Sequence, residues 1–334
     1  MVVESRARVI MSAVNQLPPN PVDSNAAFLG MGKVPSRFRN HIPSPQFPAE
    51  PDRYVLYVNY VCPWAHRAII THALKGLGDV VQIVEADSRD PTHGWYFSGR
   101  RGPDRDPIYG FRWLKELYLK ADQSYSGRIT VPMLFDKKQG TVVNNESSEI
   151  VRMFFSAFDH LLPPEKREIN KGITAFVPNH LRSEIDTLNN FIYENINNGV
   201  YKAGFATSQA AYEENVMKLF NGLDRLELHL SEPAHHPFLF GNYITETDIR
   251  LFTTMVRFDV AYYCLFKCNL KMIRFDYPRL HEWLRRLYWS EGPETNGGAF
   301  KKTTYFEEIK RGYASVAGGN GMVPIGPVPY MMPL

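Results

Sequence analysis

The chain has 334 residues, of which 44% are hydrophobic, so it is long enough for two domains that each bury a core. Its net charge of +3, without a block of basic residues, predicts no nucleic-acid or membrane-surface partner. No apolar run approaches the roughly 20 residues that cross a bilayer, and three cysteines are too few for a disulfide framework. We therefore expect a cytoplasmic protein with reduced thiols, with a mitochondrial location as the alternative.

The N-terminal half begins with an irregular segment and continues with a strand, a helix and a strand. Residues 1–50 are rich in proline and asparagine and predict an extended arm over the body of the protein. Residues 54–61 are β-branched and aromatic and predict a buried strand, residues 64–75 carry a helical period, and residues 80–87 predict a second strand. This order predicts a parallel, right-handed βαβ unit.

The pattern then breaks over residues 88–127, which are dominated by turn-forming residues. We predict a strand-free insertion ending in a short helix, and insertions of this length in compact domains tend to be functional. Residues 129–136 and 140–147 predict a hairpin, and residues 147–158 a helix with a polar start. Residues 51–160 are therefore predicted to form a small mixed sheet with helices.

The second half has a different character, because its long segments all carry a helical period. The one short strand candidate is residues 238–241, so we predict an all-α domain over residues 165–315. Residues 316–334 are rich in glycine and proline and predict an irregular tail. Cys264 and Cys268 lie one turn apart on an apolar helix, which predicts that both are buried and unreactive.

Cys62 stands where the first strand meets the following helix, and this position favours a reactive thiol. The free N–H groups and the dipole of a helix start stabilise a thiolate, and Pro63 suits the first helical position. Ala65 occupies the place of a second cysteine, so a reaction at Cys62 must stop at a mixed disulfide that an outside thiol releases. His66 and Arg67 follow and could add positive charge, although a structural role is the commoner one for such a histidine.

Two further motifs point to a peptide ligand. Pro132 follows a β-branched residue and opens a strand, which predicts a cis peptide that turns the backbone N–H and C=O of Val131 toward an extended peptide. Glu146 and Ser147 stand at a helix start, where free N–H groups suit a carboxylate. Ser147 as a simple N-cap is the alternative, but it leaves unexplained the adjacent acid, which could pair with an ammonium group.

In this order, a nucleophilic cysteine, a Val-Pro pair, a Glu-Ser pair and an all-α half resemble the glutathione transferases. The strings CPWAHR, GRITVP, NNESSEI, NNGVYKAGFA and TETDIRLF resemble one branch in particular, the glutathionyl-hydroquinone reductases or Xi class. The resemblance spans about residues 40–315. It implies an α/β thioredoxin-like N-terminal domain plus an all-α C-terminal domain, the glutathione transferase fold.

The resemblance also implies a role for each matching residue. Cys62 would be the nucleophile, Val131 would pair with the cysteinyl backbone of glutathione, and Glu146 with Ser147 would hold the γ-glutamyl end. The remaining matches are Trp95 and Arg128 for glutathione, Tyr193 and Tyr313 for catalysis, and Trp64 and Tyr263 for the aromatic pocket. The tail departs from the family pattern, because GYASVAGGNGMVP stands where Tyr-Tyr-x-Ser-His is expected, and this weakens the match at Tyr313.

The implied activity is glutathione-dependent reduction of glutathionyl-hydroquinones, or of similar aromatic small molecules, through a mixed disulfide between Cys62 and glutathione. Hydroquinone and oxidised glutathione would be released. Glutathione would be the cosubstrate, no metal would be needed, and the chain would form a homodimer. The alternatives are an Omega-type thiol transferase or dehydroascorbate reductase that uses the same cysteine, and a non-catalytic carrier of aromatic ligands.

Overall fold

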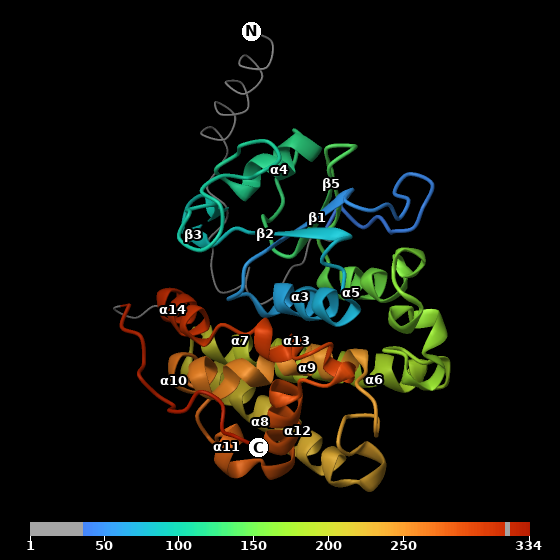
Figure 1. Ribbon diagram of the computed structural model, residues 1–334. Helices are drawn as coiled ribbons and strands as arrows, with labels where there is room; N and C mark the ends of the chain where they lie inside the picture. The colour runs from blue at the N-terminus through green and yellow to red at the C-terminus, as the bar shows by residue number, and fades with distance from the viewer. Residues whose placement is uncertain (1–35, 318–320) are drawn as a thin grey trace. The chain divides into compact units, whose positions relative to one another are not determined.

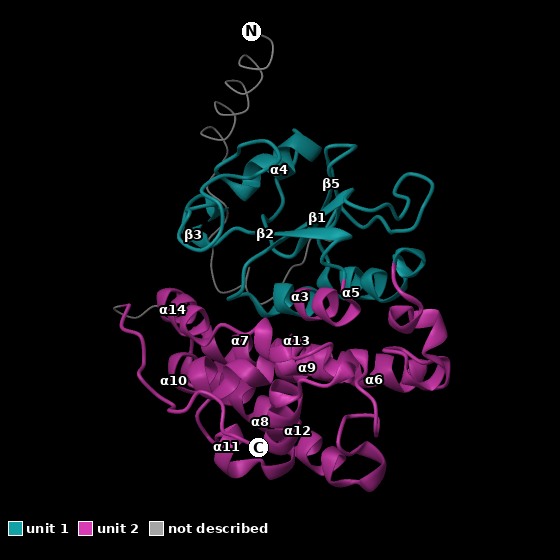
Figure 2. Ribbon diagram, viewed as in Figure 1, with its two compact units in different colours: residues 1–27, 31–68, 77–161 teal, residues 28–30, 69–76, 162–334 magenta. Residues whose placement is uncertain are grey.

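The computed structural model describes residues 36–317 and 321–334, so most of the predicted arm, residues 1–35, lies outside the described part. The described residues form two compact units (Figure 2). One unit contains residues 36–68 and 77–161, and the other contains residues 69–76, 162–317 and 321–334.

The first unit is built on a four-stranded sheet in the order β2-β1-β5-β6. β1 (Tyr54–Val58) is buried along its whole length and pairs in parallel with β2 (Val81–Glu85). On its other side β1 pairs antiparallel with β5 (Met133–Asp136), which pairs antiparallel with β6 (Thr141–Asn144). α3 (Pro63–Lys75) connects β1 to β2, so the predicted parallel βαβ unit and the predicted hairpin are both confirmed.

Helices cover both faces of this sheet. α5 (Ser147–Ser156) and the first turns of α3 lie on one face, and α4 (Leu114–Ala121) lies on the other (Figure 1). Ile150 and Phe154, which lie one turn apart on α5, are completely buried. The spacing of these apolar residues is what made the helix predictable from the sequence.

The prediction that residues 88–127 contain no strand was wrong. β3 (Ser88–Asp90) and β4 (Gly94–Tyr96) pair antiparallel, with Arg89 opposite Trp95. Asp90 forms the turn between them, because its Oδ1 accepts the N–H groups of Thr92 at 2.8 Å and His93 at 2.7 Å. Such an Asp-centred turn is typical of a loop when it is seen in sequence alone, and strands of three residues carry no periodic signal.

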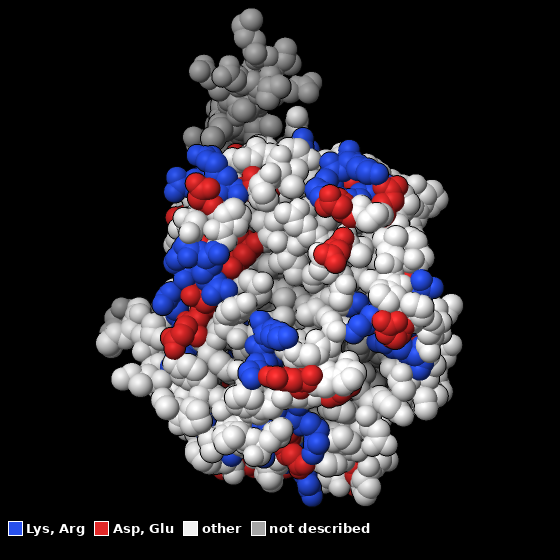
Figure 3. Space-filling view, viewed as in Figure 1, with Lys and Arg blue, Asp and Glu red and all other residues white. Residues whose placement is uncertain are grey.

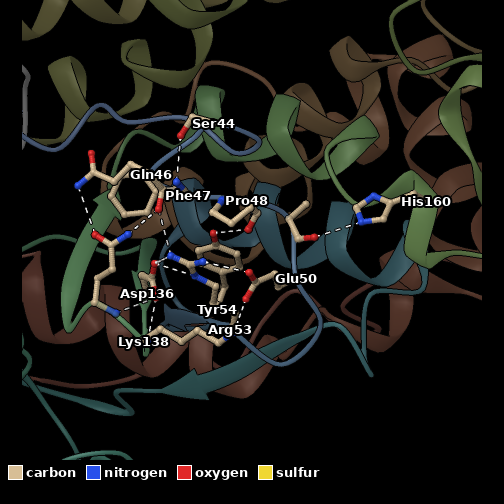
Figure 4. Close-up of polar contacts among 12 residues, drawn as sticks. Ser44, Gln46, Phe47, Pro48, Glu50, Arg53, Tyr54, Asp136, Lys138 and His160 are labelled. Atoms are coloured by element: carbon tan, nitrogen blue, oxygen red, sulfur yellow. Dashed lines mark hydrogen bonds and ion pairs between the residues drawn. The ribbon is translucent and has the colours of Figure 1, made fainter.

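The segment just before β1 is fixed to the sheet by buried polar contacts (Figure 4). Arg53 donates to Oδ2 of Asp136 from Nε at 2.9 Å and from Nη2 at 2.6 Å, and Nη2 also donates to the carbonyl oxygen of Gln46 at 3.1 Å. The Tyr54 hydroxyl donates to the carbonyl oxygen of Pro48 at 2.6 Å. This part of the arm therefore packs against the first unit.

The regular secondary structure described in the second unit is all helical, which confirms the predicted all-α domain. The stretch 238–241 forms only an isolated bridge between Phe238 and Gly241. The helices are α6 (Arg182–Ile192), α7 (Gly199–Gly204), α8 (Gln209–Ser231), α9 (Glu246–Arg257), α10 (Tyr263–Leu265), α11 (Ile273–Asp276), α12 (Pro278–Trp289), α13 (Ala299–Lys302) and α14 (Phe306–Val316). Two π-helical segments, Tyr193–Asn197 and Phe258–Tyr262, continue α6 and α9.

A buried carboxylate joins α9 to α12. Asp248 accepts the N–H of Thr245 and its hydroxyl, both at 2.8 Å, which caps the start of α9. Its other oxygen accepts Nε1–H of Trp283 at 2.8 Å. Burial raises the pKa of Asp248, and these hydrogen bonds oppose that rise.

Residues 321–334 form no helix or strand, and side chains of the neighbouring helices bind their carbonyl oxygens. Nη2 of Arg274 donates to Pro329 and Tyr330, each at 3.1 Å, and Nε1 of Trp289 donates to Met332 at 2.8 Å. The tail is therefore anchored through its backbone carbonyl groups, and the Tyr330 hydroxyl adds a hydrogen bond to Glu307.

Among the described residues, no helix is both long and apolar enough to span a membrane. Basic side chains on the face shown in Figure 3 lie beside acidic ones, so that face carries no large field of one sign.

Candidate functional site

The sheet topology brings four segments of the first unit to the same end of the sheet (Figure 1). Because β1 and β2 are parallel and β5 and β6 alternate in direction, the ends of β1, β2 and β6 lie beside the start of β5. In sheet order, these four points carry the β3–β4 hairpin, Cys62, Val131, and the pair Glu146 and Ser147. The residues of the first unit that were predicted to bind glutathione therefore belong to segments at the same end of the sheet.

Asn59 builds the turn that presents Cys62. Its Nδ2 donates to the carbonyl oxygen of Ala86 at 2.8 Å, and its Oδ1 accepts the N–H of Val61 at 2.9 Å. The N–H of Cys62 donates to the carbonyl oxygen of Asn59 at 3.1 Å. The carbonyl oxygen of Cys62 then accepts the N–H of His66 at 3.0 Å, so Cys62 occupies the N-cap position of α3.

The thiol of Cys62 is half-buried and lies against the second predicted motif. Its Sγ donates to the carbonyl oxygen of Val131 at 3.5 Å. The Val131–Pro132 peptide is cis, as predicted. The nucleophile and the predicted backbone pairing site are therefore in direct contact, although 69 residues separate them in the chain.

The residues of α3 that directly follow Trp64 are buried in the protein. Ala65 and His66 are completely buried and Arg67 is nearly so. The guanidinium carbon of Arg67 lies 4.6 Å from the ring centroid of Trp64, which is itself half-buried. Trp64 is thus held beside Cys62 by a cation–π contact within its own helix.

Arg128 interacts electrostatically with Cys62. Burial of its guanidinium lowers the pKa of Arg128, the charge of Arg89 lowers it further, and Tyr125 and Cys62 oppose these effects. The residue nevertheless exposes much of its surface, so the guanidinium is reachable while protein surrounds part of it. Because the attraction is mutual, Arg128 favours a negative charge on the Cys62 sulfur.

Glu146, and not Ser147, is the N-cap of α5, so the alternative interpretation of Ser147 was wrong. Oε1 of Glu146 accepts the N–H of Ser148 at 3.3 Å and its hydroxyl at 3.1 Å. The N–H of Glu146 donates to Oδ1 of Asn144 at 2.7 Å. Ser147 is the first residue of the helix and is 5% exposed.

Trp95 lies in β4 and is half-buried. The guanidinium carbon of Arg89, opposite it on β3, lies 6.0 Å from its ring centroid. Arg89 could not be predicted from the sequence, because one arginine in a turn-rich insertion belongs to no motif. The charge of Arg89 lowers the pKa of Arg128, so the two arginines interact electrostatically.

The second unit holds the predicted tyrosines. The Tyr313 hydroxyl lies 2.6 Å from that of Tyr201 and 2.9 Å from that of Tyr262, and all three residues are at most 2% exposed. Burial raises the pKa of Tyr313 well above its usual value. Tyr193 is the first residue of the π-helical segment that follows α6, and Tyr263 is the first residue of α10. Both are half-buried. Tyr201 and Tyr262 were not predicted, because core tyrosines are indistinguishable in sequence from catalytic ones.

The two other cysteines of the chain fall in the second unit. Cys268 is completely buried, as predicted, and burial raises the pKa of its thiol. Cys264 is exposed, so the prediction that it is buried was wrong. α10 ends at Leu265, so Cys264 and Cys268 do not share the one helix face that the sequence had suggested. Over the described residues, no group of three or more His, Cys, Asp or Glu side chains is placed to hold a metal ion.

Comparisons with known proteins agree with this geometry. The family model described as "Glutathione S-transferase, N-terminal domain" matches residues 61–156, and that of the C-terminal domain matches residues 209–286. The chain is 46% identical to Glutathione S-transferase omega-like 2 of Schizosaccharomyces pombe, over 88% of this chain and 92% of that protein. It is 44% identical to the glutathionyl-hydroquinone reductase YqjG of Escherichia coli, over 84% and 81%.

Solved structures give the same result. The glutathione S-transferase Xi from Phanerochaete chrysosporium matches with a TM-score of 0.83 and 46% identity, covering 90% of this chain and 94% of that one. The glutathione-bound structure of YqjG from E. coli matches with a TM-score of 0.78 and 41% identity, covering 90% and 96%. The chain therefore belongs to the glutathione transferase family, in the Xi class with the glutathionyl-hydroquinone reductases.

Proposed function

We propose that this protein is a glutathionyl-hydroquinone reductase. The observation that carries the proposal is the position of Cys62: half-buried at the start of α3, against the carbonyl oxygen of Val131, with buried Ala65 where a second cysteine would stand. A thiol with no partner thiol nearby can take up a glutathionyl group but cannot release it alone. Glutathione, as cosubstrate, supplies the second thiol.

The reaction has two steps. The Cys62 thiolate attacks the sulfur of the substrate's glutathionyl group, so that a disulfide forms while the bond from sulfur to the ring carbon breaks. The ring carbon takes up a proton, and hydroquinone leaves. A second glutathione, as its thiolate, then attacks the mixed disulfide, which releases oxidised glutathione and restores the Cys62 thiolate. Overall, two glutathionyl sulfurs are oxidised to one disulfide and the aromatic substrate is reduced by two electrons.

Glutathione would lie along the end of the sheet that carries these residues. Its γ-glutamyl end would bind at Glu146 and Ser147, where the half-buried carboxylate can pair with the ammonium group. The backbone of Val131 would pair with the cysteinyl residue, which places its sulfur near Cys62. Trp95 and Arg128 would bind the remaining end. Arg128 also favours the thiolate that attacks.

The proton for the ring carbon needs a donor, for which we propose a tyrosine of the second unit. Tyr193 and Tyr263 are half-buried in the second unit, and Trp64 is half-buried in the first, so each has a surface that a ligand can reach. Tyr313 lies at the centre of the three-hydroxyl chain, which could pass a proton between its members. Which of these acts is a question for single Tyr→Phe variants.

The decisive assay compares the rate with a glutathionyl-hydroquinone against the rate with dehydroascorbate, at equal glutathione. A reductase of the proposed kind releases hydroquinone and oxidised glutathione in equal amounts and prefers the quinol thioether. Faster turnover of dehydroascorbate would support the Omega-type alternative, a class that the name of the S. pombe relative also mentions. Binding of quinones without consumption of glutathione would support the carrier alternative.

We also propose that two copies of the chain form a dimer, as the Xi-class resemblance implies, and that the protein acts in the cytoplasm, where reduced glutathione is plentiful. Light scattering coupled to gel filtration tests the first statement. Localisation of the tagged full chain tests the second.

A further inference from the structure

Arg128, which interacts electrostatically with Cys62, and Arg89, whose charge acts on Arg128, have no acidic residue of the described chain bound to their side chains. Neither Arg89 nor Arg128 makes a side-chain hydrogen bond or an ion pair with any of the residues that the structure describes. Burial lowers the pKa of both guanidinium groups, and their like charges act on each other at Arg128. Bringing two cations together at a partly desolvated place costs free energy unless an anion joins them.

The acidic residue next to Arg89 is already engaged. Asp90 attracts Arg89 electrostatically, but its Oδ1 accepts the N–H groups of Thr92 and His93 and lies 3.0 Å from Nδ1 of His93. Asp90 therefore forms the β3–β4 turn and does not bind the arginine. The guanidinium of Arg89, which contacts the ring of Trp95 and is only half-buried, therefore keeps hydrogen-bond donors for a ligand.

The topology says where on glutathione this anion would be. Along the end of the sheet, the order is the hairpin with Arg89 after β2, then Cys62 after β1, Val131 before β5, and Ser147 after β6. Adjacent strands are about 4.8 Å apart, so β2 and β6 are separated by about 14 Å. An extended three-residue peptide spans about 10 Å, and the γ-linkage of glutathione makes it longer.

A glutathione with its γ-glutamyl end at Ser147 and its cysteinyl residue at Val131 must place its glycyl carboxylate beyond Cys62, on the β2 side. We propose that Arg89 is a further positioning residue, which together with Arg128 binds the glycyl carboxylate of glutathione and thereby fixes the glutathionyl sulfur opposite Cys62. This inference rests on the proposed function and adds to it a residue of the insertion. The contact of Arg89 with Trp95 holds the guanidinium in place for this role.

The test measures binding and not turnover. In the Cys62→Ser background, the change in tryptophan fluorescence is titrated with glutathione and with its monoethyl ester, whose glycyl carboxylate is blocked. With Arg89 present, the acid should bind more tightly than the ester. With Arg89→Gln, the Kd for the acid should rise about 5–20-fold, while the Kd for the ester should stay almost unchanged, so that discrimination is largely lost.

Arg112→Gln is the matched control. Arg112 is an exposed arginine of the same insertion, and its guanidinium carbon lies 5.9 Å from the ring centroid of Trp113, so the substitution removes the same charge and the same kind of ring contact. It should leave both Kd values unchanged. Arg89→Lys keeps the charge and should recover part of the discrimination. The loss in Arg89→Gln should also shrink as the salt concentration rises, which a purely structural effect would not do.

The possible outcomes test the role of Arg89 and the proposed function separately. If Arg89→Gln is folded by circular dichroism and still discriminates fully between acid and ester, the role of Arg89 is refuted and the proposed reaction stands. Equal loss for the acid and the ester in Arg89→Gln would make Arg89 a structural residue and also refute the inference. If the Cys62→Ser protein with Arg89 intact binds no glutathione, the proposed function itself fails.

Discussion

The Cys62 sulfur lies 3.5 Å from the carbonyl oxygen of Val131, which stands just before strand β5. This contact joins the nucleophile to the backbone segment at which the cysteinyl residue of glutathione is proposed to pair. It follows from the topology, because the end of β1 and the start of β5 are neighbours in the sheet. A glutathionyl sulfur placed by Val131 would therefore arrive beside the attacking thiolate.

Replacing Cys62 by serine should abolish turnover, with a loss of at least about 10³-fold in rate, because a hydroxyl cannot form the mixed disulfide and is a far weaker nucleophile. Release of hydroquinone from a glutathionyl-hydroquinone measures this directly. Cys264→Ser, which changes an exposed cysteine of the second unit, is the control and should leave the rate unchanged. Substantial activity in Cys62→Ser would rule out the mechanism.

Asn59→Ala should destabilise the protein and slow the reaction together. The substitution leaves the carbonyl oxygen of Ala86 and the N–H of Val61 without their partner in a nearly buried turn, at a cost of about 1–3 kcal/mol. Because this turn presents Cys62, the rate at saturating substrate should fall as well. Urea denaturation and steady-state kinetics measure the two effects. An unchanged rate in a folded variant would show that Asn59 does not position the thiol.

Tyr313→Phe should lower the free energy of unfolding by about 1–2 kcal/mol, because it removes the hydroxyl that joins those of Tyr201 and Tyr262 inside the second unit. Tyr243→Phe, at a residue that is 44% exposed, is the matched control and should change stability little. Thermal and urea denaturation measure the free energy of unfolding of both variants. Equal stability of both variants would mean that the buried hydroxyl chain contributes nothing to folding.

Arg39→Gln should change how stability depends on pH. Burial would raise the pKa of Glu149, but hydrogen bonds from Arg39, at 2.7 Å for Nε, and from Asn144 outweigh it and hold the pKa below its ordinary value of 4.5. A carboxyl with a lowered pKa stabilises the folded state above its unfolded value and loses that contribution as the pH falls through the lowered one.

The variant should therefore be less stable than the wild type at pH 7 by about 0.5–1 kcal/mol, since the pair is partly exposed. The difference should disappear once the pH is below the lowered pKa of Glu149. Arg37→Gln is the control, because Asp122 keeps its hydrogen bonds from Ser124. A stability difference that is constant from pH 7 to pH 3 would contradict the assignment.

The sequence predicted the parts of this structure that have a period or a motif. The βαβ unit and the hairpin follow from apolar patterns, and the cis peptide at Pro132 follows from its place at a strand start. The β3–β4 strands were missed because three residues cannot show alternation. Arg89 was missed with them, since its meaning depends on Trp95 and Arg128, which only the fold brings near.

The same limit applies to the tyrosines. The sequence suggested Tyr313 but not Tyr201 or Tyr262, because hydroxyl groups from three separate helical segments meet only after packing. The alternative that Ser147 caps α5 was also wrong, since Glu and Ser can both cap a helix and only the backbone register decides between them.

The most direct test of the central claim is mass spectrometry of the intact protein after a glutathionyl-hydroquinone is added in the absence of free glutathione. We expect that hydroquinone is released once per active site, that the protein gains the mass of one glutathionyl group on Cys62, and that added glutathione removes it. Release of hydroquinone over many turnovers without free glutathione, or with no adduct on Cys62, would contradict the proposed reaction.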